Sequence, residues 1–137
     1  MKYTYTAVIT YDERSHRYHC RVPDLNGCIS SGRDLSEALD MIQDAAAVWL
    51  VSSEDHGDPF IPPTPQSKVA HQPDDYLSII RIDTIKYRAE TDTRAVRKSV
   101  SIPAWMANLA GRYGMNLSQL LQDALRAAFE AHNGHHI

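Results

Sequence analysis

The chain has 137 residues, of which 43% are apolar and 23% are charged, values close to those of ordinary soluble domains. This composition excludes wholesale disorder, and the longest apolar run, residues 45–51, is much shorter than the roughly 20 residues of a membrane helix. The first residues contain no apolar signal-peptide core, so we expect a cytoplasmic protein. Cys20 and Cys28 are then reduced thiols, too few for a disulfide framework or a four-thiolate zinc site.

Charge is distributed unevenly along the chain. Residues 1–87 contain eight Lys or Arg and thirteen Asp or Glu, a formal charge of −5, whereas residues 88–137 contain six basic and four acidic residues, a charge of +2. An acidic first part and a mildly basic second part predict two modules with different partners. Scatter of a few charges is the alternative interpretation.

The first third of the chain begins with three predicted strands. Apolar and aromatic residues alternate with Thr from Tyr3 to Tyr11, which predicts a strand with one buried face. A polar turn at 12–16 separates it from a second alternating stretch at 17–22, so the two form a hairpin. Turn-forming residues then lead to a short third strand at 28–31.

A helix is expected next. Asp34 precedes Glu37 by three residues, the capping-box spacing in which each side chain accepts a hydrogen bond from a free backbone N–H. Apolar residues then recur at helical spacing to about Ser52. Five of the seven prolines lie in residues 53–75, which predicts a loop, and the β-rich stretch 76–85 predicts a fourth strand.

A polar connector at 86–94 leads into a different pattern. Apolar residues alternate with Arg and Ser up to Pro103, which predicts a strand that ends at this proline. Helical spacing then predicts one helix that ends at a left-handed Gly114 and a second that starts at Asn116. The apolar residues of the strand and of the second helix are Val96, Val100, Ile102, Leu117, Leu120, Leu121 and Leu125.

A single strand leaves its backbone unpaired and cannot cover two amphipathic helices. We therefore expect a two-fold homodimer in which two such strands pair antiparallel and the seven apolar residues form a shared core. Arg97, Ser99 and Ser101 then point outward on a two-stranded ribbon that fits the major groove of DNA. Asn116 and Ser118, at the start of the second helix, are placed to bind a phosphate group.

The segment RAVRKSVSIPAWMANLAGRYGMNLSQLLQDALRAAF, residues 94–129, resembles ribbon–helix–helix DNA-binding domains. The strand VRKSVSIP, the turn GMN and the helix start NLSQ carry the resemblance. In that family the outward strand residues read the DNA sequence, which implies this role for Arg97, Ser99 and Ser101. The alternative is a helical dimerisation tail with a solvated Arg97.

The segment CRVPDLNGCISSGRDLSEALDMIQDAAAVWL, residues 20–50, resembles HicB antitoxins. The motifs VPDL, GC and SEA, together with Gly32, carry this resemblance. It implies a partial ribonuclease-H-like fold in the N-terminal domain. It also implies a type II antitoxin that binds a HicA-like messenger-RNA-cleaving toxin and represses its own operon by binding operator DNA.

Together the two resemblances imply an α+β protein with three parts. The first is a β-β-β-α-β toxin-binding domain at residues 1–87, the second a linker at 88–93, and the third a ribbon–helix–helix domain at 94–137. The partners implied are the toxin, double-stranded operator DNA and a second copy of the chain. The sequence leaves open whether two dimers join into a tetramer.

The sequence leaves two other functions open. One is a repressor whose front domain senses a small molecule or another protein. The other is a metal-dependent nuclease, which needs several carboxylates around two metal ions. The acidic residues available are Asp12, Asp24, Glu37 and Asp83. Turns and a helix cap account for most of them, so we expect no catalysis, no metal and no cofactor.

Histidines are concentrated near the end of the chain, at His132, His135 and His136. A histidine-rich tract is one type of metal-binding sequence, but we interpret this one as a frayed tail. A zinc site that joins His19 to the two cysteines lacks the usual ligand spacing.

Overall fold

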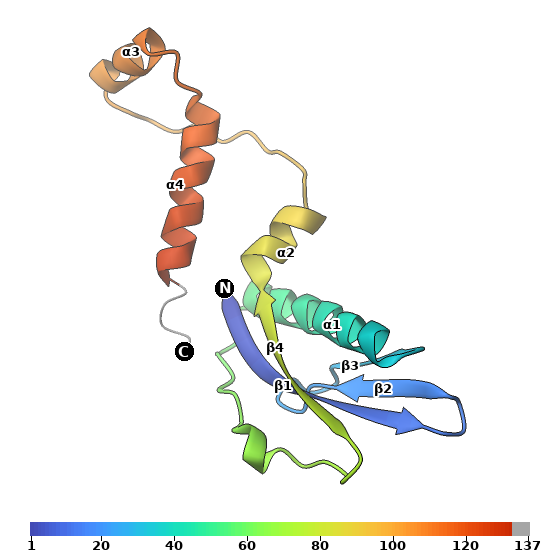
Figure 1. The fold of residues 1–137 in the computed structure, drawn as a ribbon. Coiled ribbons are helices and arrows are strands. Elements are labelled where there is room, and N and C mark those ends of the chain that lie inside the picture. The colour runs from blue at the N-terminus through green and yellow to red at the C-terminus, as the bar shows by residue number, and fades with distance from the viewer. Residues whose placement is uncertain (133–137) are drawn as a thin grey trace.

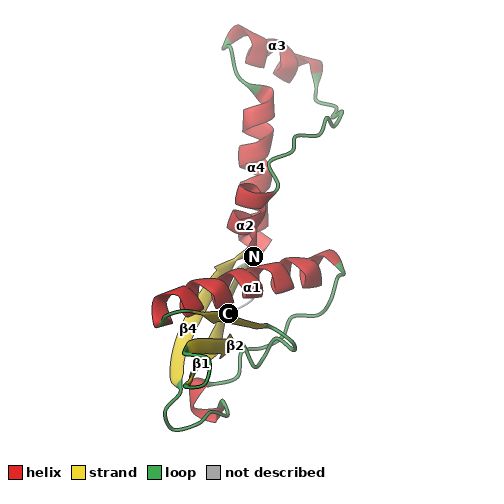
Figure 2. Ribbon diagram, turned by 90° about the vertical axis from the view of Figure 1, so that its right-hand side faces the viewer, coloured by secondary structure: helices red, strands yellow, loops and turns green. Residues whose placement is uncertain are grey.

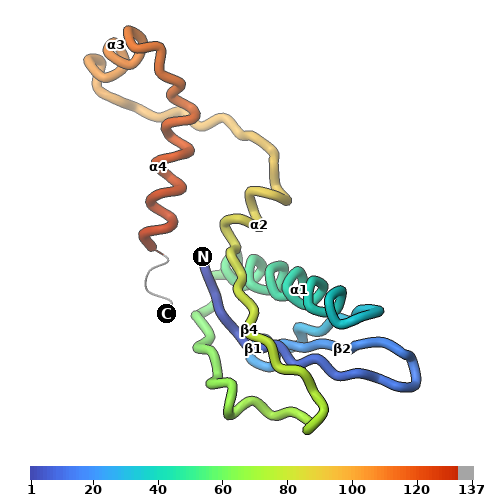
Figure 3. The backbone as a smooth tube through the Cα atoms, in the orientation of Figure 1, coloured from blue at the N-terminus to red at the C-terminus, as the bar shows by residue number. Residues whose placement is uncertain are grey.

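The computed structural model describes residues 1–132 as a sheet with one long helix on it, from which the last two helices project (Figures 1 and 3). The elements in chain order are β1 (Lys2–Asp12), β2 (Arg17–Arg21), β3 (Ile29–Gly32), α1 (Leu35–Asp55), the short 3₁₀ helix η1 (Gln66–Lys68), β4 (Tyr76–Asp83), α2 (Thr84–Thr91), α3 (Ala104–Arg112) and α4 (Leu117–His132). The α+β class is confirmed, as is the order of three strands, a helix and a fourth strand.

The strands form one antiparallel sheet in the order β3-β2-β1-β4. Strand β1 is central, and its Ile9 lies opposite both Cys20 of β2 and Tyr76 of β4. The hairpin of β1 and β2 was expected from their alternation, whereas the pairing of β1 with β4 joins residues that are more than sixty positions apart. The edges of the sheet are β3 and β4.

Helix α1 covers one face of the sheet (Figure 2). Alternate side chains of β1 pack against the apolar stripe of this helix, and full burial of an aliphatic side chain such as Ile42 contributes about 1.5–3 kcal/mol. The core consists of Tyr3, Tyr5, Ala7, Ile9, Cys20, Val22, Leu25, Cys28, Ala38, Ile42, Ala46, Ala47, Leu50, Ile80 and Ile82.

The opposite face of the sheet is also partly covered, which differs from the single buried face expected for β1. Thr6 and Val8 alternate with the core residues and therefore point to that face, yet both are buried. The long loop between α1 and β4 passes on this side (Figure 2). There Val69 is buried, and the Ala70 carbonyl accepts a hydrogen bond from Arg21 at 2.9 Å. The proline-rich loop is therefore part of the packed structure.

The start of α1 confirms the predicted cap. Asp34 Oδ1 accepts a hydrogen bond from the backbone N–H of Glu37 at 2.8 Å. The Glu37 carboxylate accepts in return from the backbone N–H of Arg33 at 3.1 Å, and it also binds the Arg33 guanidinium. Each side chain thus satisfies a free backbone donor. The helix ends at Asp55, three residues beyond the predicted end.

The polar connector expected over 86–94 is wrong for most of its length, because α2 occupies Thr84–Thr91. Asp83 caps this helix, since its Oδ1 accepts hydrogen bonds from the backbone N–H groups of Ile85 and Lys86, each at 3.1 Å. Tyr87 packs against the core from α2. The fourth strand therefore ends at Asp83 rather than at Ile85, and the helix continues directly from it.

The strand expected at 96–102 is not formed within the single chain, where residues 92–103 belong to no helix or strand. A strand needs a partner backbone, and no strand of the described sheet lies beside this segment (Figures 1 and 3). Both helices after it form as expected. Pairing of the segment with a second copy stays a prediction.

Gly32 ends β3 against the first turn of α1. A Cβ atom there would lie 2.7 Å from the Cα of Ala38, so we expect Gly32→Ala to lower the free energy of unfolding by roughly 1–3 kcal/mol. Gly111→Ala is the control, because beyond its chain neighbours and the backbone of its own helix no atom lies within 4 Å of that added Cβ. Thermal unfolding of both variants measures the difference. An unchanged melting temperature for Gly32→Ala would contradict this packing.

Candidate functional site

The extended segment before α3 exposes its apolar side chains. Val96 is 78% exposed and Val100 64% exposed, whereas apolar residues of a stable strand are normally covered on at least one face. The intervening Arg97, Ser99 and Ser101 are also exposed. The segment therefore has the alternating pattern predicted for a DNA-reading strand, although the single chain brings no cover to its apolar side.

The turn between α3 and α4 is well defined. Gly114 has a φ of 61°, a left-handed conformation that favours glycine. The N–H of Met115 donates to the carbonyl of Ala110 at 3.0 Å, and the N–H of Gly114 donates to Gly111 at 3.2 Å. This pair of bonds is the Schellman motif, so the predicted cap at Gly114 is confirmed.

Asn116 caps α4, as predicted. Its Oδ1 accepts a hydrogen bond from the backbone N–H of Gln119 at 3.1 Å. The Gln119 side chain does not return this contact, because its amide donates to Asp123 at 2.9 Å. The exposed Ser118 lies in the same first turn, whose remaining N–H groups can face an anion.

Helix α4 is strongly amphipathic but has no buried residue in the single chain. In α3 the only buried residue is Ala110. The exposed apolar residues of the C-terminal part are Val96, Val100, Ile102, Trp105, Met106, Leu109, Tyr113, Met115, Leu117, Leu120, Leu121, Leu125 and Phe129. They include all seven predicted dimer-core residues, so this part of the chain does not cover its own apolar surface.

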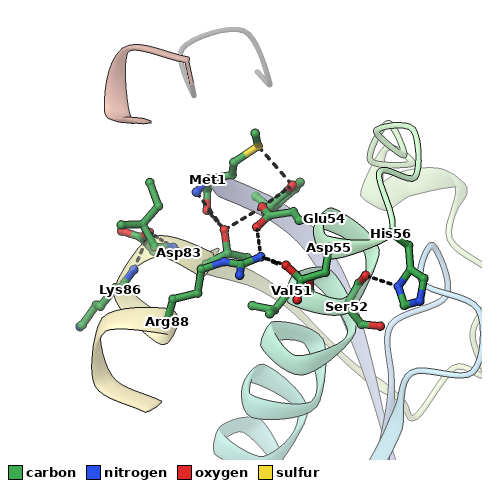
Figure 4. A network of polar contacts seen from close by, with 12 residues as sticks. Met1, Val51, Ser52, Glu54, Asp55, His56, Asp83, Lys86 and Arg88 are labelled. Atoms are coloured by element: carbon green, nitrogen blue, oxygen red, sulfur yellow. Dashed lines mark hydrogen bonds and ion pairs between the residues drawn. The ribbon is translucent and has the colours of Figure 1, made fainter. Parts of the chain in front are cut away.

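A network of polar contacts lies at the C-terminal end of α1 in the N-terminal unit (Figure 4). The Glu54 carboxylate, near the end of α1, accepts hydrogen bonds from Tyr3 and Thr84 at 2.8 Å and forms an ion pair with Arg88 at 3.1 Å. Burial and the bond to Glu54 raise the pKa of Tyr3, so this phenol stays neutral. Arg88 also binds Asp55, which joins α2 to α1.

The four carboxylates considered for catalysis lie apart and have structural partners. Asp24 binds both the N–H and the hydroxyl of Thr64, and Asp12 binds Ser15 and His19. Glu37 and Asp83 are the helix-capping residues described above. Among residues 1–132, no three His, Cys, Asp or Glu side chains are grouped so that they could hold a metal ion. This arrangement gives no support to a two-metal nuclease centre.

Cys20 and Cys28 are buried free thiols. Burial, together with the proximity of Cys20, raises the pKa of Cys28 to about 11, so the thiol is protonated near neutral pH. His19 lies on the other face of the sheet, where it binds Asp12 at 3.2 Å. His132 ends α4, while His135 and His136 lie outside the described residues.

A cavity of about 230 Å³ lies at the end of α1. It is the candidate binding site for the alternative function, a repressor that senses a small molecule. Tyr3, Tyr5, Trp49 and Phe60 line it. The Tyr5 hydroxyl donates to the Ile61 carbonyl at 2.7 Å, and burial raises the pKa of this phenol to about 12. The two tyrosine hydroxyls that line the cavity bind to the protein itself, and the polar residues Ser53 and Asp58 also line it.

No helix within residues 1–132 is long and apolar enough to cross a bilayer. The fold combines an α+β unit with a C-terminal part that contains two amphipathic helices. The family model described as "HicB_like antitoxin of bacterial toxin-antitoxin system" matches residues 5–132. The chain therefore belongs to the HicB-like antitoxin family.

Solved structures agree with this assignment at the level of the fold. A toxin–antitoxin complex from Streptococcus pneumoniae contains a chain that is 22% identical, with a TM-score of 0.59, and the match covers 93% of this chain and 99% of that chain. The Burkholderia pseudomallei antitoxin HicB is 20% identical, with a TM-score of 0.51 and coverage of 95% and 96%. A search of curated protein sequences found no match.

A substitution at Leu121 tests whether the exposed apolar face of α4 is used for dimerisation. We expect Leu121→Asp to prevent dimer formation, because it would place a charge in a small shared apolar core. The control is Gln122→Asp, which adds the same charge at an adjacent exposed position. Sedimentation velocity measures the mass of each variant. An intact Leu121→Asp dimer would show that α4 does not use this face.

Proposed function

We propose that this chain is a type II antitoxin that neutralises a HicA-like messenger-RNA-cleaving toxin and represses its own operon at operator DNA. The N-terminal domain, proposed for residues 1–87 and extended by the rest of α2, binds the toxin. The C-terminal domain, proposed for residues 94–137, dimerises and binds DNA. The observation that carries the proposal is one chain with a self-contained acidic α+β unit and a C-terminal part whose apolar face is uncovered.

Electrostatics supports the toxin partner. A protein that binds and cleaves messenger RNA must attract a polyanion, so its RNA-binding surface is basic. Residues 1–87 carry a formal charge of −5 and offer the opposite field. Opposite fields speed encounter and favour the correct partner. The similar chain from Streptococcus pneumoniae was itself solved in a toxin–antitoxin complex.

The proposed DNA interface needs two copies of the chain. In such a dimer the 96–102 segments pair as a ribbon, Arg97, Ser99 and Ser101 face the bases, and the capped start of α4 at Asn116 and Ser118 faces a phosphate. The uncovered apolar residues of the strand and α4 form the core. A tetramer of two such dimers would bring more ribbons to DNA and raise avidity.

The proposal assigns no catalysis, cofactor or metal to this chain. Its named carboxylates are explained by caps and turns, and its thiols are buried and protonated. Free buried thiols suit the reducing conditions of the cytoplasm, which is where an operator-binding protein acts.

Co-purification tests the toxin half of the proposal. We expect the full chain, tagged and expressed together with the reading frame next to its gene, to retain a small basic protein that arrests growth when expressed alone. Growth should recover when both are present. Arrest that continues despite soluble antitoxin would contradict the proposed function.

Arg97→Ala should weaken operator binding by roughly 1–3 kcal/mol while the dimer persists, because it removes an exposed base contact and no core side chain. Lys98→Ala is the matched control, since Lys98 occupies the alternate position of the strand and is expected to matter less. Binding titrations on the operator at fixed salt measure both. Equal affinities for Arg97→Ala and the unmodified protein would show that the ribbon does not read DNA.

Deletion of residues 94–137 should preserve neutralisation and abolish operator binding, because the N-terminal unit has its own core and the Glu54 network. Loss of dimer avidity is expected to weaken neutralisation only in part. The measurement is growth with the toxin, alongside DNA binding in vitro. Full toxicity in the presence of a folded, soluble N-terminal fragment would show that the toxin contacts lie in residues 94–137, which contradicts the proposed roles of the two parts.

A further inference from the structure

Three tyrosines from three strands gather at the hairpin end of the sheet. Tyr11 of β1 lies 5.0 Å from Tyr18 of β2 between ring centroids, and Tyr18 lies 6.3 Å from Tyr76 of β4. All three are separated by an even number of residues from the core residues of their own strands, so they lie on the face that α1 covers farther along the sheet. Tyr11 is 43% exposed and Tyr76 48% exposed. The cluster is therefore an aromatic surface that the chain leaves open.

An acidic groove lies on the same face, between α1 on one side and β4 and α2 on the other. Its volume is about 350 Å³. Its acidic groups are Asp40, Asp44, Asp83 and Glu90, and its basic groups are Arg81 and Lys86. Asp83 is occupied as the cap of α2. Among residues 1–132, the exposed Asp40, Asp44 and Glu90 form no ion pair or side-chain hydrogen bond.

We propose that the tyrosine cluster and the acidic groove together form the toxin-docking face of the antitoxin, an inference that rests on the function proposed above. Tyrosines supply large apolar contact area with a polar tip, and such residues dominate binding energy at protein interfaces. The unpaired carboxylates Asp40 and Asp44 bind Lys or Arg side chains of the toxin that otherwise contact RNA. Docking here covers part of the RNA-binding surface of the toxin.

The charge of this face favours the toxin over a second copy of the chain or DNA as its partner. A second copy joined about a two-fold axis would bring two faces with an excess of acidic groups together, and this repulsion disfavours the association. DNA phosphates would be repelled for the same reason. A basic protein is therefore the partner that fits both the tyrosine cluster and the acidic groove.

The experiment measures the affinity of the full-length chain for the toxin that co-purifies with it. Asp44→Lys reverses an exposed charge in the groove, and Asp58→Lys makes the same change beyond the far end of α1. Tyr76→Ala removes an exposed ring, and Ile79→Ala removes an exposed apolar side chain from the opposite face of the same strand. Thermal unfolding of each variant verifies its fold.

We expect Asp44→Lys and Tyr76→Ala each to weaken toxin binding at least tenfold, and the two controls to change it less than threefold. The effect of Asp44→Lys should shrink as salt is raised, because screening weakens contacts between partly exposed charges. Equal effects of the test and control variants would overturn the docking face while leaving the antitoxin function intact. A changed oligomeric state without a change in toxin affinity would do the same. Failure of the unmodified chain to bind any toxin would overturn the function as well.

Discussion

The structure depends on one constraint, which is that the C-terminal part of the chain cannot bury its own apolar side chains. Val96 and Val100 belong to no strand, and α4 carries a row of half-exposed leucines with no buried residue. At about 25 cal/mol per Å², leaving such a face in water forfeits most of the stabilisation that holds a small domain together. In the dimer proposed above, a second copy would supply the missing half of the core, and the ribbon would form from the same association.

The N-terminal unit has the opposite character. Its core closes within one chain, because α1 covers one face of the sheet and the proline-rich loop covers part of the other. Glu54 then ties β1, α1 and α2 through Tyr3, Thr84 and Arg88. Under the proposed function, a unit whose core closes within one chain would bind a toxin in every assembly state, whereas the proposed DNA-binding part would be complete only as a dimer. This difference would explain how one chain serves the two proposed partners.

Local patterns predicted most of the elements. Period-two alternation located β1 and β2, and spacing rules located the caps at Asp34 and Asn116. Helix α2 was missed because its sequence is polar, although Asp83 was available as a capping signal. The tyrosine cluster was missed for another reason, since it depends on a β1–β4 register that no local pattern contains. The strand predicted at 96–102 is not formed in the single chain, and its pairing with a second chain stays a prediction.

Hydrogen exchange of the 96–102 segment, measured in the full-length protein at increasing concentration, tests the central claim most directly. Amides that pair in a ribbon exchange slowly, whereas amides of an exposed extended segment exchange fast. The account predicts alternating protection within this segment that appears together with the dimer and disappears in Leu121→Asp. A stable dimer whose 96–102 amides remain unprotected would contradict it.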